Sequence, residues 1–235
     1  MRNRNRIPVI AVLILAIVGV VAPSANAAAT RYITVSAQGT VQVTPDAVRI
    51  NATATNVAAT SKDALAANAK TAISVRTALK TAKVDSKDIA TQSVTVYPEY
   101  KYATDGTSTQ IGYRASQSFT IVVRAADAAG SVVDSLVLAG GDSLQINGAN
   151  PFVLDSTKSL ESARAAAVKT AKSKATSYAK LMSVTLGKVN YLVENSAPTN
   201  YTPVMAVAKA ESDATVIDLG QQDVTISITV QWTLL

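Results

Sequence analysis

The segment that most constrains the fold is residues 161–189, ESARAAAVKTAKSKATSYAKLMSVTLGKV, in which alanine and lysine are the most frequent residues. At about 100° per residue, a helix here places a narrow apolar stripe opposite a lysine face. The stripe contains Leu160, Ala167, Ala171, Tyr178 and Met182, and the opposite face contains Lys158, Lys169, Lys172 and Lys180. Because small residues let a helix approach a sheet closely, we expect Leu160 and Tyr178 to be buried on a sheet and the lysines to face water.

Alternation of apolar and polar residues predicts strands on both sides of this helix. Pro45 cannot donate to a sheet ladder, so it separates the first two strands. Asp105 and Gly106 are typical of the loop of a hairpin. The expected strands cover residues 31–43, 46–58, 94–121 (a hairpin), 142–154, 188–196 and 221–235.

Two further helices are expected. Thr60 and Asp63 resemble a capping box at the start of a long helix over 61–83. A shorter helix ends at Gly140 and Gly141, because glycine commonly follows the last helical turn. The predicted fold class is therefore α+β, a largely antiparallel sheet with two long helices and one shorter helix.

The first 27 residues have the three parts of a secretory signal peptide. Arg2, Arg4 and Arg6 form a basic start, the run Val9–Ala22 is apolar, and small residues lead up to Ala27. The apolar run is shorter than the roughly 20 residues that a transmembrane helix needs. We expect cleavage near Ala27, no membrane span in the mature protein, and export to the periplasm, the cell surface or the medium. A retained anchor is the alternative.

Cleavage would leave residues 28–235 as one domain, with a long proline-containing loop at about 196–220. Three of the 22 lysines and arginines lie in the removed segment, so the formal net charge would fall from +6 to +3. Such a small excess, carried largely on the outer face of a core helix, argues against a nucleic-acid partner.

Half of the chain's tyrosines gather around the predicted hairpin of about 94–121. Tyrosine offers a large contact area with a polar tip and is enriched at interfaces. Pro98 is typical of an edge strand, and the loop ATDGTST is polar. We expect the hairpin to extend as an arm that mediates homo-oligomer formation; cover of the chain's own sheet and contact with carbohydrate or the cell wall are the alternatives. The four residues are Tyr97, Tyr100, Tyr102 and Tyr113.

The chain resembles the SIMPL-domain family of exported bacterial proteins, which includes periplasmic immunogenic proteins. The resemblance spans about Tyr32 to Leu235 and implies one α+β domain of βαβ-type units, members that form large ring-like oligomers, and no established catalytic residues. Ser183 is a departure, because the family usually has a glycine near this helix end. The matching segments, in order, are ITVSAQGTVQVTPDAVRI, DIATQSVTVYPEYKY with GYRASQSFTIVVR, ESARAAAVKTAKSKATSYAKLMSVTLGKV and DVTISITVQWTLL.

The chain contains no histidine and no cysteine. It therefore lacks the means for a Ser-His-Asp triad, an imidazole or thiolate metal site, or a disulfide. We expect no catalytic, cofactor-binding or metal-binding residues, and an exported, non-enzymatic, self-assembling protein of the cell envelope or extracellular space. The alternative is an envelope hydrolase or transferase that uses Ser177 and Lys180, which match the S-x-x-K pattern of penicillin-binding enzymes.

Overall fold

The computed structural model describes residues 31–195, 203–204 and 214–235. The helices in this part of the chain are α1 (Ser61–Thr81), α2 (Ala129–Gly140) and α3 (Thr157–Leu181). The strands are β1 (Tyr32–Val43), β2 (Ala47–Ala58), β3 (Ile89–Tyr102), β4 (Ser108–Val123), β5 (Leu144–Phe152), β6 (Leu186–Glu194), β7 (Pro203–Val204) and β8 (Gln221–Leu234).

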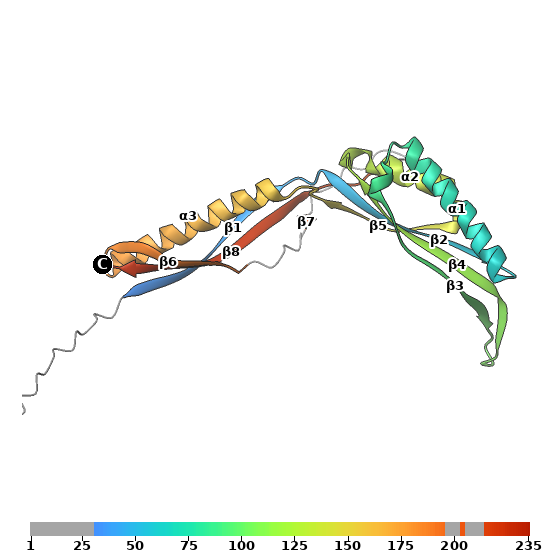
Figure 1. Ribbon diagram of the computed structural model, residues 1–235, viewed down its shortest axis with the longest axis horizontal. Helices are drawn as coiled ribbons and strands as arrows, with labels where there is room; N and C mark the ends of the chain where they lie inside the picture. The colour runs from blue at the N-terminus through green and yellow to red at the C-terminus, as the bar shows by residue number, and fades with distance from the viewer. Residues whose placement is uncertain (1–30, 196–202, 205–213) are drawn as a thin grey trace, which may run out of the picture.

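Two sheets lie end to end in an arched molecule, and the helices cover the same side of both (Figure 1). One sheet has the order β1–β8–β6, with β7 paired to β8, and α3 lies along it. The other has the order β3–β4–β2–β5 and carries α1 and α2. Across the described residues every strand pair is antiparallel. The expected α+β class is therefore confirmed, and α1 between β2 and β3 and α3 between β5 and β6 supply the βαβ-type order.

The local sequence signals for helix and strand ends are found in the structure. The break at Pro45 separates β1 from β2, and these two strands belong to different sheets. The Thr60 hydroxyl caps α1 by accepting the Asp63 amide hydrogen at 3.1 Å. The loop expected at about 196–220 lies largely outside the described residues; within it, β7 pairs with β8.

The buried residues of helix α3 are all alanines. Its buried residues recur every four positions, and they face β1 and β8. These residues are Ala163, Ala167, Ala171, Ala175 and Ala179. Across the sheet they meet Val35, Val224, Ile226, Ile228 and Val230. The expectation of a close helix–sheet contact through small residues is confirmed, and Lys169 and Lys172 are exposed as expected.

The expectation that Tyr178 is buried is wrong. Its side chain is 53% exposed and Met182 is 50% exposed, while Leu160 is half-buried against the alanine core. A helical wheel assumes a contact line parallel to the helix axis, whereas the sheet below α3 twists. Because contacts recur every four residues, the buried line moves about 40° around the helix at each step. By the last turn it has reached Ala179, and Tyr178 points to solvent.

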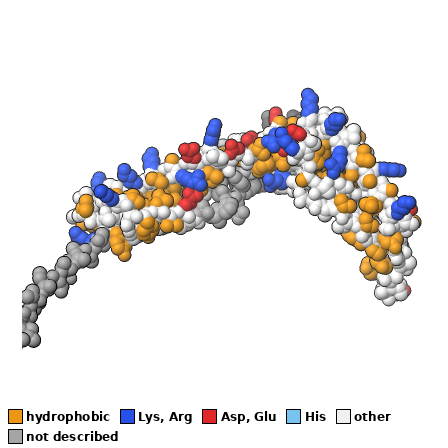
Figure 2. Space-filling model, in the orientation of Figure 1, with side chains coloured by type: hydrophobic (Ala, Val, Ile, Leu, Met, Phe, Trp, Pro, Cys, Tyr) orange, Lys and Arg blue, Asp and Glu red, His pale blue; other side chains and the backbone are white. Residues whose placement is uncertain are grey.

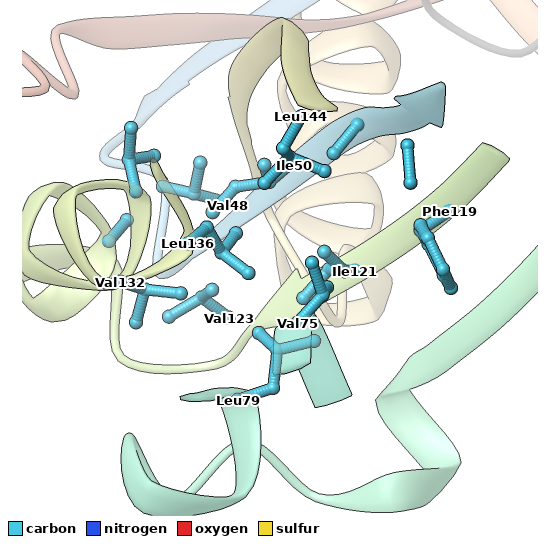
Figure 3. Close-up of a cluster of buried hydrophobic side chains, with 14 of the residues drawn as sticks. Val48, Ile50, Val75, Leu79, Phe119, Ile121, Val123, Val132, Leu136 and Leu144 are labelled. Carbon is cyan, nitrogen blue, oxygen red and sulfur yellow. The ribbon is translucent and has the colours of Figure 1, made fainter. Parts of the chain in front are cut away.

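The second sheet has a larger-residue core beneath α1 and α2 (Figure 3). Phe119 and Ile121 from β4 and Ile50 from β2 are at most 1% exposed. Leu79 of α1 and Leu136 of α2 close this core from the helical side and are fully buried. The close-up shows these side chains converging between sheet and helices. The core fixes the base of the β3–β4 hairpin, which carries the candidate site.

Candidate self-association surface

The β3–β4 hairpin continues beyond the sheet that supports it (Figure 1). Pairing between β2 and β4 ends at Ala58 and Tyr113, whereas pairing between β3 and β4 continues to Tyr102 and Ser108. Residues 99–112 therefore form a two-stranded ribbon, called the arm below. The extended hairpin suggested by the sequence is present, and its role in self-association stays a prediction.

A polar turn closes the end of the arm. Oδ1 of Asp105 accepts the hydroxyl of Thr107 at 2.7 Å and its amide hydrogen at 2.9 Å. These hydrogen bonds, that of the hydroxyl first, hold the pKa of Asp105 below its usual value. Gly106 has a φ of 86°, a conformation that glycine adopts without steric cost. Because the Asp105 carboxylate is already hydrogen-bonded within the turn, we look to the two faces and the outer edge of the arm for a surface that a partner could contact.

The four tyrosines are divided between the two faces of the hairpin. Tyr113 pairs directly with Pro98, so both lie on one face, and Tyr100 and Tyr102 follow on that face at period two. Tyr97 pairs with Arg114 and lies on the opposite face. Tyr100 is 44% exposed and Tyr102 is 76% exposed, whereas Tyr113 is half-buried. The structure thus brings together three of the four sequence-predicted residues and separates Tyr97 from them.

A charged pair on the opposite face was not identified from the sequence. Nε of Arg114 donates to Oε2 of Glu99 at 2.6 Å, in a two-pronged contact. The Arg114 hydrogen bonds keep the pKa of Glu99 below its usual value. Lys101 lies two residues further along the same face and is exposed. The segment PEYKY alternates tyrosines with charged residues, and this alternation could have indicated a charged face opposite the tyrosines.

The strand β3 forms an edge of its sheet and exposes apolar side chains before the arm begins. Val94 is 53% exposed and Val96 is 36% exposed. They lie on the helical side, but α1 is centred over β2 and β4. Figure 2 shows hydrophobic side chains gathered toward this end of the molecule, while lysines and arginines project from the helical side of the arch. An apolar edge strand of this kind is a template for strand pairing.

The Ser-Lys alternative falls on the solvent side of α3. Ser177 and Lys180 are both exposed and lie in the last turns of the helix, next to Lys169 and Lys172 on a shallow surface. In penicillin-binding enzymes the serine of S-x-x-K begins a helix. The residues that the structure describes give no hydrogen bond between Ser177 and Lys180 and no third group that orients either one.

Other features of the described ranges do not define a competing site. An open groove of about 730 Å³ lies between α1 and α2 and is lined mostly by alanines, serines and threonines, together with Ile73, Val132 and Leu138. No group of three or more aspartates or glutamates within 31–195 and 214–235 is placed to hold a metal ion. None of the helices described has the length and apolar character needed to cross a membrane.

The chain belongs to the SIMPL family, whose description is a protein of unknown function (DUF541); the match covers residues 33–232. The family assignment made from the sequence segments is therefore confirmed. The matched residues include the arm and nearly all of both sheets.

Individual relatives match over most of their length. The 26 kDa periplasmic immunogenic protein of Brucella melitensis is 28% identical over 211 residues, which are 84% of this chain and 82% of that protein. The protein of the same name in Brucella abortus has the same identity and coverage. The uncharacterized protein YggE of Edwardsiella ictaluri is 33% identical over 189 residues, which are 75% of this chain and 76% of that protein.

Proposed function

We propose that this chain is an exported, non-enzymatic protein of the cell envelope or extracellular space that self-assembles through its arm. The observation that carries this proposal is the arm itself, a two-stranded ribbon with exposed tyrosines on one face. A lone two-stranded hairpin is marginal in water. Contact with another chain would cover its apolar side and stabilise it.

Export is supported by the N-terminal sequence and by the relatives. The arginines and apolar run before Ala27 have the order of a signal peptide. The Brucella relatives carry the word periplasmic in their names. We propose a periplasmic or other exported location with cleavage near Ala27. Mass spectrometry of the protein purified from the exported fraction tests this, because an intact N-terminus would indicate a retained anchor.

A non-enzymatic role is supported by the residue inventory. Without histidine or cysteine, Ser177 and Lys180 are the remaining nucleophile and base suggested by a motif. Their exposed position offers no enclosed site in which an acyl intermediate would be protected. A serine-directed activity probe on the exported protein tests this alternative. Labelling that a Ser177→Ala variant abolishes would replace the present proposal with an acyl-transfer enzyme.

Self-association is tested by the mass of the exported protein in solution. Replacing Tyr100 and Tyr102 with serine should lower the mass measured by light scattering while circular dichroism remains unchanged. Tyr32 and Tyr191 are matched controls, since they are 60% and 41% exposed and belong to the other sheet. Serine at these two positions should leave the mass unchanged. A monomeric wild type at micromolar concentration would rule out assembly, and arm-dependent retention on isolated cell wall would then favour carbohydrate binding.

A further inference from the structure

We propose that two copies of the chain pair antiparallel through the β3 strands of their arms, in a register centred on Tyr100. This inference rests on the proposed self-association and specifies its geometry. The pairing would join the two arms into one four-stranded sheet of order β4–β3–β3–β4. Addition of a strand to an exposed edge is an established mode of recognition that combines main-chain hydrogen bonds with side-chain selection.

The outer edge of the arm is open to another strand. β3 is the edge of its sheet, with β4 on its other side. Beyond the last β2–β4 pair, Ala58 with Tyr113, the arm has no third strand among the described residues. An unpaired row of main-chain amide and carbonyl groups therefore lies along the outer side of residues 98–102. Such a row favours pairing with a strand of another chain.

The direction of these groups follows from the turn. The Ala103 amide donates to the Thr107 carbonyl at 2.9 Å, so Ala103 faces β4. Main-chain groups alternate along a strand, so Lys101 and Glu99 also face β4. Pro98, Tyr100 and Tyr102 face outward. The extra residue of the bulge between Glu99 and Tyr100 lies in β4, so the alternation along β3 is not interrupted. Because the Pro98 nitrogen faces away from β4, its missing amide hydrogen removes no hydrogen bond between β3 and β4.

A twofold axis at Tyr100 gives each outward amide hydrogen a carbonyl acceptor on the other copy. The Tyr100 amides would bond to the Tyr100 carbonyls of the other copy. Each Tyr102 amide would donate to a Pro98 carbonyl of the other copy. Proline returns no amide hydrogen, so the carbonyl of Tyr102, whose side chain is 76% exposed, would bond to water. On the tyrosine face, Tyr102 would pack against Pro98 and the two Tyr100 rings would adjoin. The exposed aromatic area would then be shared across the axis.

Charge distinguishes this register from its neighbours. Centred on Tyr100, the pairing sets Lys101 opposite Glu99 of the second copy, twice. Centred on Glu99 it would set two glutamates against each other, and centred on Lys101 two lysines. Like charges directly opposite destabilise a strand pair, whereas opposite charges stabilise it. Centred on Pro98, the middle of the pairing would lack both amide donors. The Tyr100 register alone among these four gives opposite charges at the central pairs.

The monomer already holds Glu99 in position for this contact. Arg114 of β4 binds its carboxylate and keeps it ionised on the charged face of the arm. Lys101 forms no ion pair within the described residues and is exposed. In the paired arms each Glu99 carboxylate would lie between Arg114 of its own chain and Lys101 of the other. The lysine would gain a partner without displacing the existing contact.

Single cysteines test the register directly, because the chain contains none of its own. Glu99 and Lys101 of opposing copies would form a non-hydrogen-bonded pair with Cα atoms about 4.5 Å apart. That spacing lies within the usual disulfide range of about 4.4–6.8 Å. Exported full-length proteins carrying Glu99→Cys and Lys101→Cys, with different affinity tags, should form a mixed disulfide when combined and mildly oxidised. Each variant alone should give little dimer, and circular dichroism should show both folded.

The competing registers give different products in the same experiment. Efficient dimers of Glu99→Cys alone would indicate an axis at Glu99, and those of Lys101→Cys alone an axis at Lys101. Either result, or the absence of any mixed disulfide in a protein that light scattering shows to be oligomeric, would overturn the Tyr100 register and leave self-assembly standing. A monomeric wild-type protein would instead end both proposals.

A charge reversal supplies an independent measurement. Lys101→Glu would place carboxylates opposite each other at both pairs and should weaken association roughly tenfold or more. Lys172→Glu makes the same change in net charge at an exposed position on α3 and serves as the control. Association constants from analytical ultracentrifugation at low salt should fall for the arm variant only. Equal constants for the two variants would contradict the pairing of Lys101 with Glu99.

Discussion

Gly39 of β1 lies directly against Ala167 of α3, with no room for a side chain between them. A Cβ atom on Gly39 would overlap the amide nitrogen of Ala167 and the carbonyl oxygen of Ala163. Glycine on the strand and alanine on the helix therefore set the separation of α3 from its sheet. A helix–sheet contact this close gains many dispersion contacts, but a single added methyl group cannot be accommodated.

Substitution of Gly39 by alanine is expected to destabilise the protein strongly. The methyl group would meet backbone atoms of α3, which cannot rotate away as a flexible side chain can. We expect a loss of about 1–3 kcal/mol in the free energy of unfolding, measured by urea denaturation. Gly148→Ala is the control, since its methyl group would lie 3.4 Å from the side chain of Asn150. The control should stay within about 0.5 kcal/mol.

The buried alanines of α3 predict that substitutions on the sheet-facing side of the helix cost more stability than substitutions on its exposed side. Ala171→Leu would force a larger side chain into a fully buried position and should cost about 1–3 kcal/mol. Tyr178→Ala removes a larger side chain that is 53% exposed, and should change stability by less than about 1 kcal/mol. Thermal unfolding followed by circular dichroism measures both. If Tyr178→Ala lost more stability than Ala171→Leu, Tyr178 would lie in the core, as the sequence pattern predicted.

The error at Tyr178 shows where sequence patterns stop being sufficient. Helix and strand positions follow from local residues such as Thr60 and Pro45, and these were predicted correctly. Which side of α3 is buried depends on the twist of a sheet formed by β1 and β8, strands that are distant in the sequence. Periodicity carries no information on that twist. A helix with large apolar residues would have fixed its own orientation more clearly than one with alanine.

The candidate site was predictable to a similar extent. The tyrosines, Pro98 and the turn at Gly106 indicated an exposed hairpin, and the structure has one. The division of the tyrosines between two faces required the register, in which Pro98 pairs with Tyr113 and Tyr97 with Arg114. Ile111 is an extra, unpaired residue in β4, so counting residues outward from the turn gives the wrong partner for every residue beyond it. The pairing of Glu99 with Arg114 therefore could not be obtained from sequence spacing alone.

The ends of α1 and α3 share one backbone arrangement that glycine should improve. Lys83 and Ser183 have φ values of 59° and 57°, in the left-handed region. In each case the following valine donates back into the last turn, Val84 to Leu79 and Val184 to Ala179. This is the Schellman arrangement, in which glycine is usual because other residues are strained by their Cβ atom. Ser183 occupies the place where the family resemblance implied a glycine.

We expect Ser183→Gly and Lys83→Gly each to raise the free energy of unfolding by about 0.5–1 kcal/mol. Relief of Cβ strain should exceed the extra flexibility that glycine gives the unfolded chain. Lys172→Gly, at an exposed position inside α3, should instead lower stability by about 1 kcal/mol. Opposite signs in parallel urea titrations would establish the role of the left-handed residues. A loss at all three positions would show that glycine acts through the unfolded chain alone.

The base of the β3–β4 hairpin is held by an ion pair that should make stability depend on pH. Asp88 precedes β3, Arg124 follows β4, and the arginine donates to both carboxylate oxygens at 2.6 and 2.8 Å. The aspartate side chain is only 7% exposed. Its hydrogen bonds with Arg124 lower its pKa, more than burial raises it. The native state therefore binds this proton less readily than the unfolded chain does.

A lowered native pKa stabilises the fold at pH values above the unfolded pKa of about 3.9, and this contribution is lost as the pH falls through the native value. Asp88→Asn should therefore lower the midpoint of thermal unfolding at pH 7, and the difference from wild type should shrink as the pH approaches the native pKa from above. Asp85→Asn makes the same charge change at a neighbour whose pKa is also lowered, by its contact with Lys87. Both side chains of that pair are more than half exposed, so this variant should have a much smaller effect across the same pH range. A constant difference between Asp88→Asn and wild type across the acid range would mean that the variant acts through packing and not through the charge on Asp88.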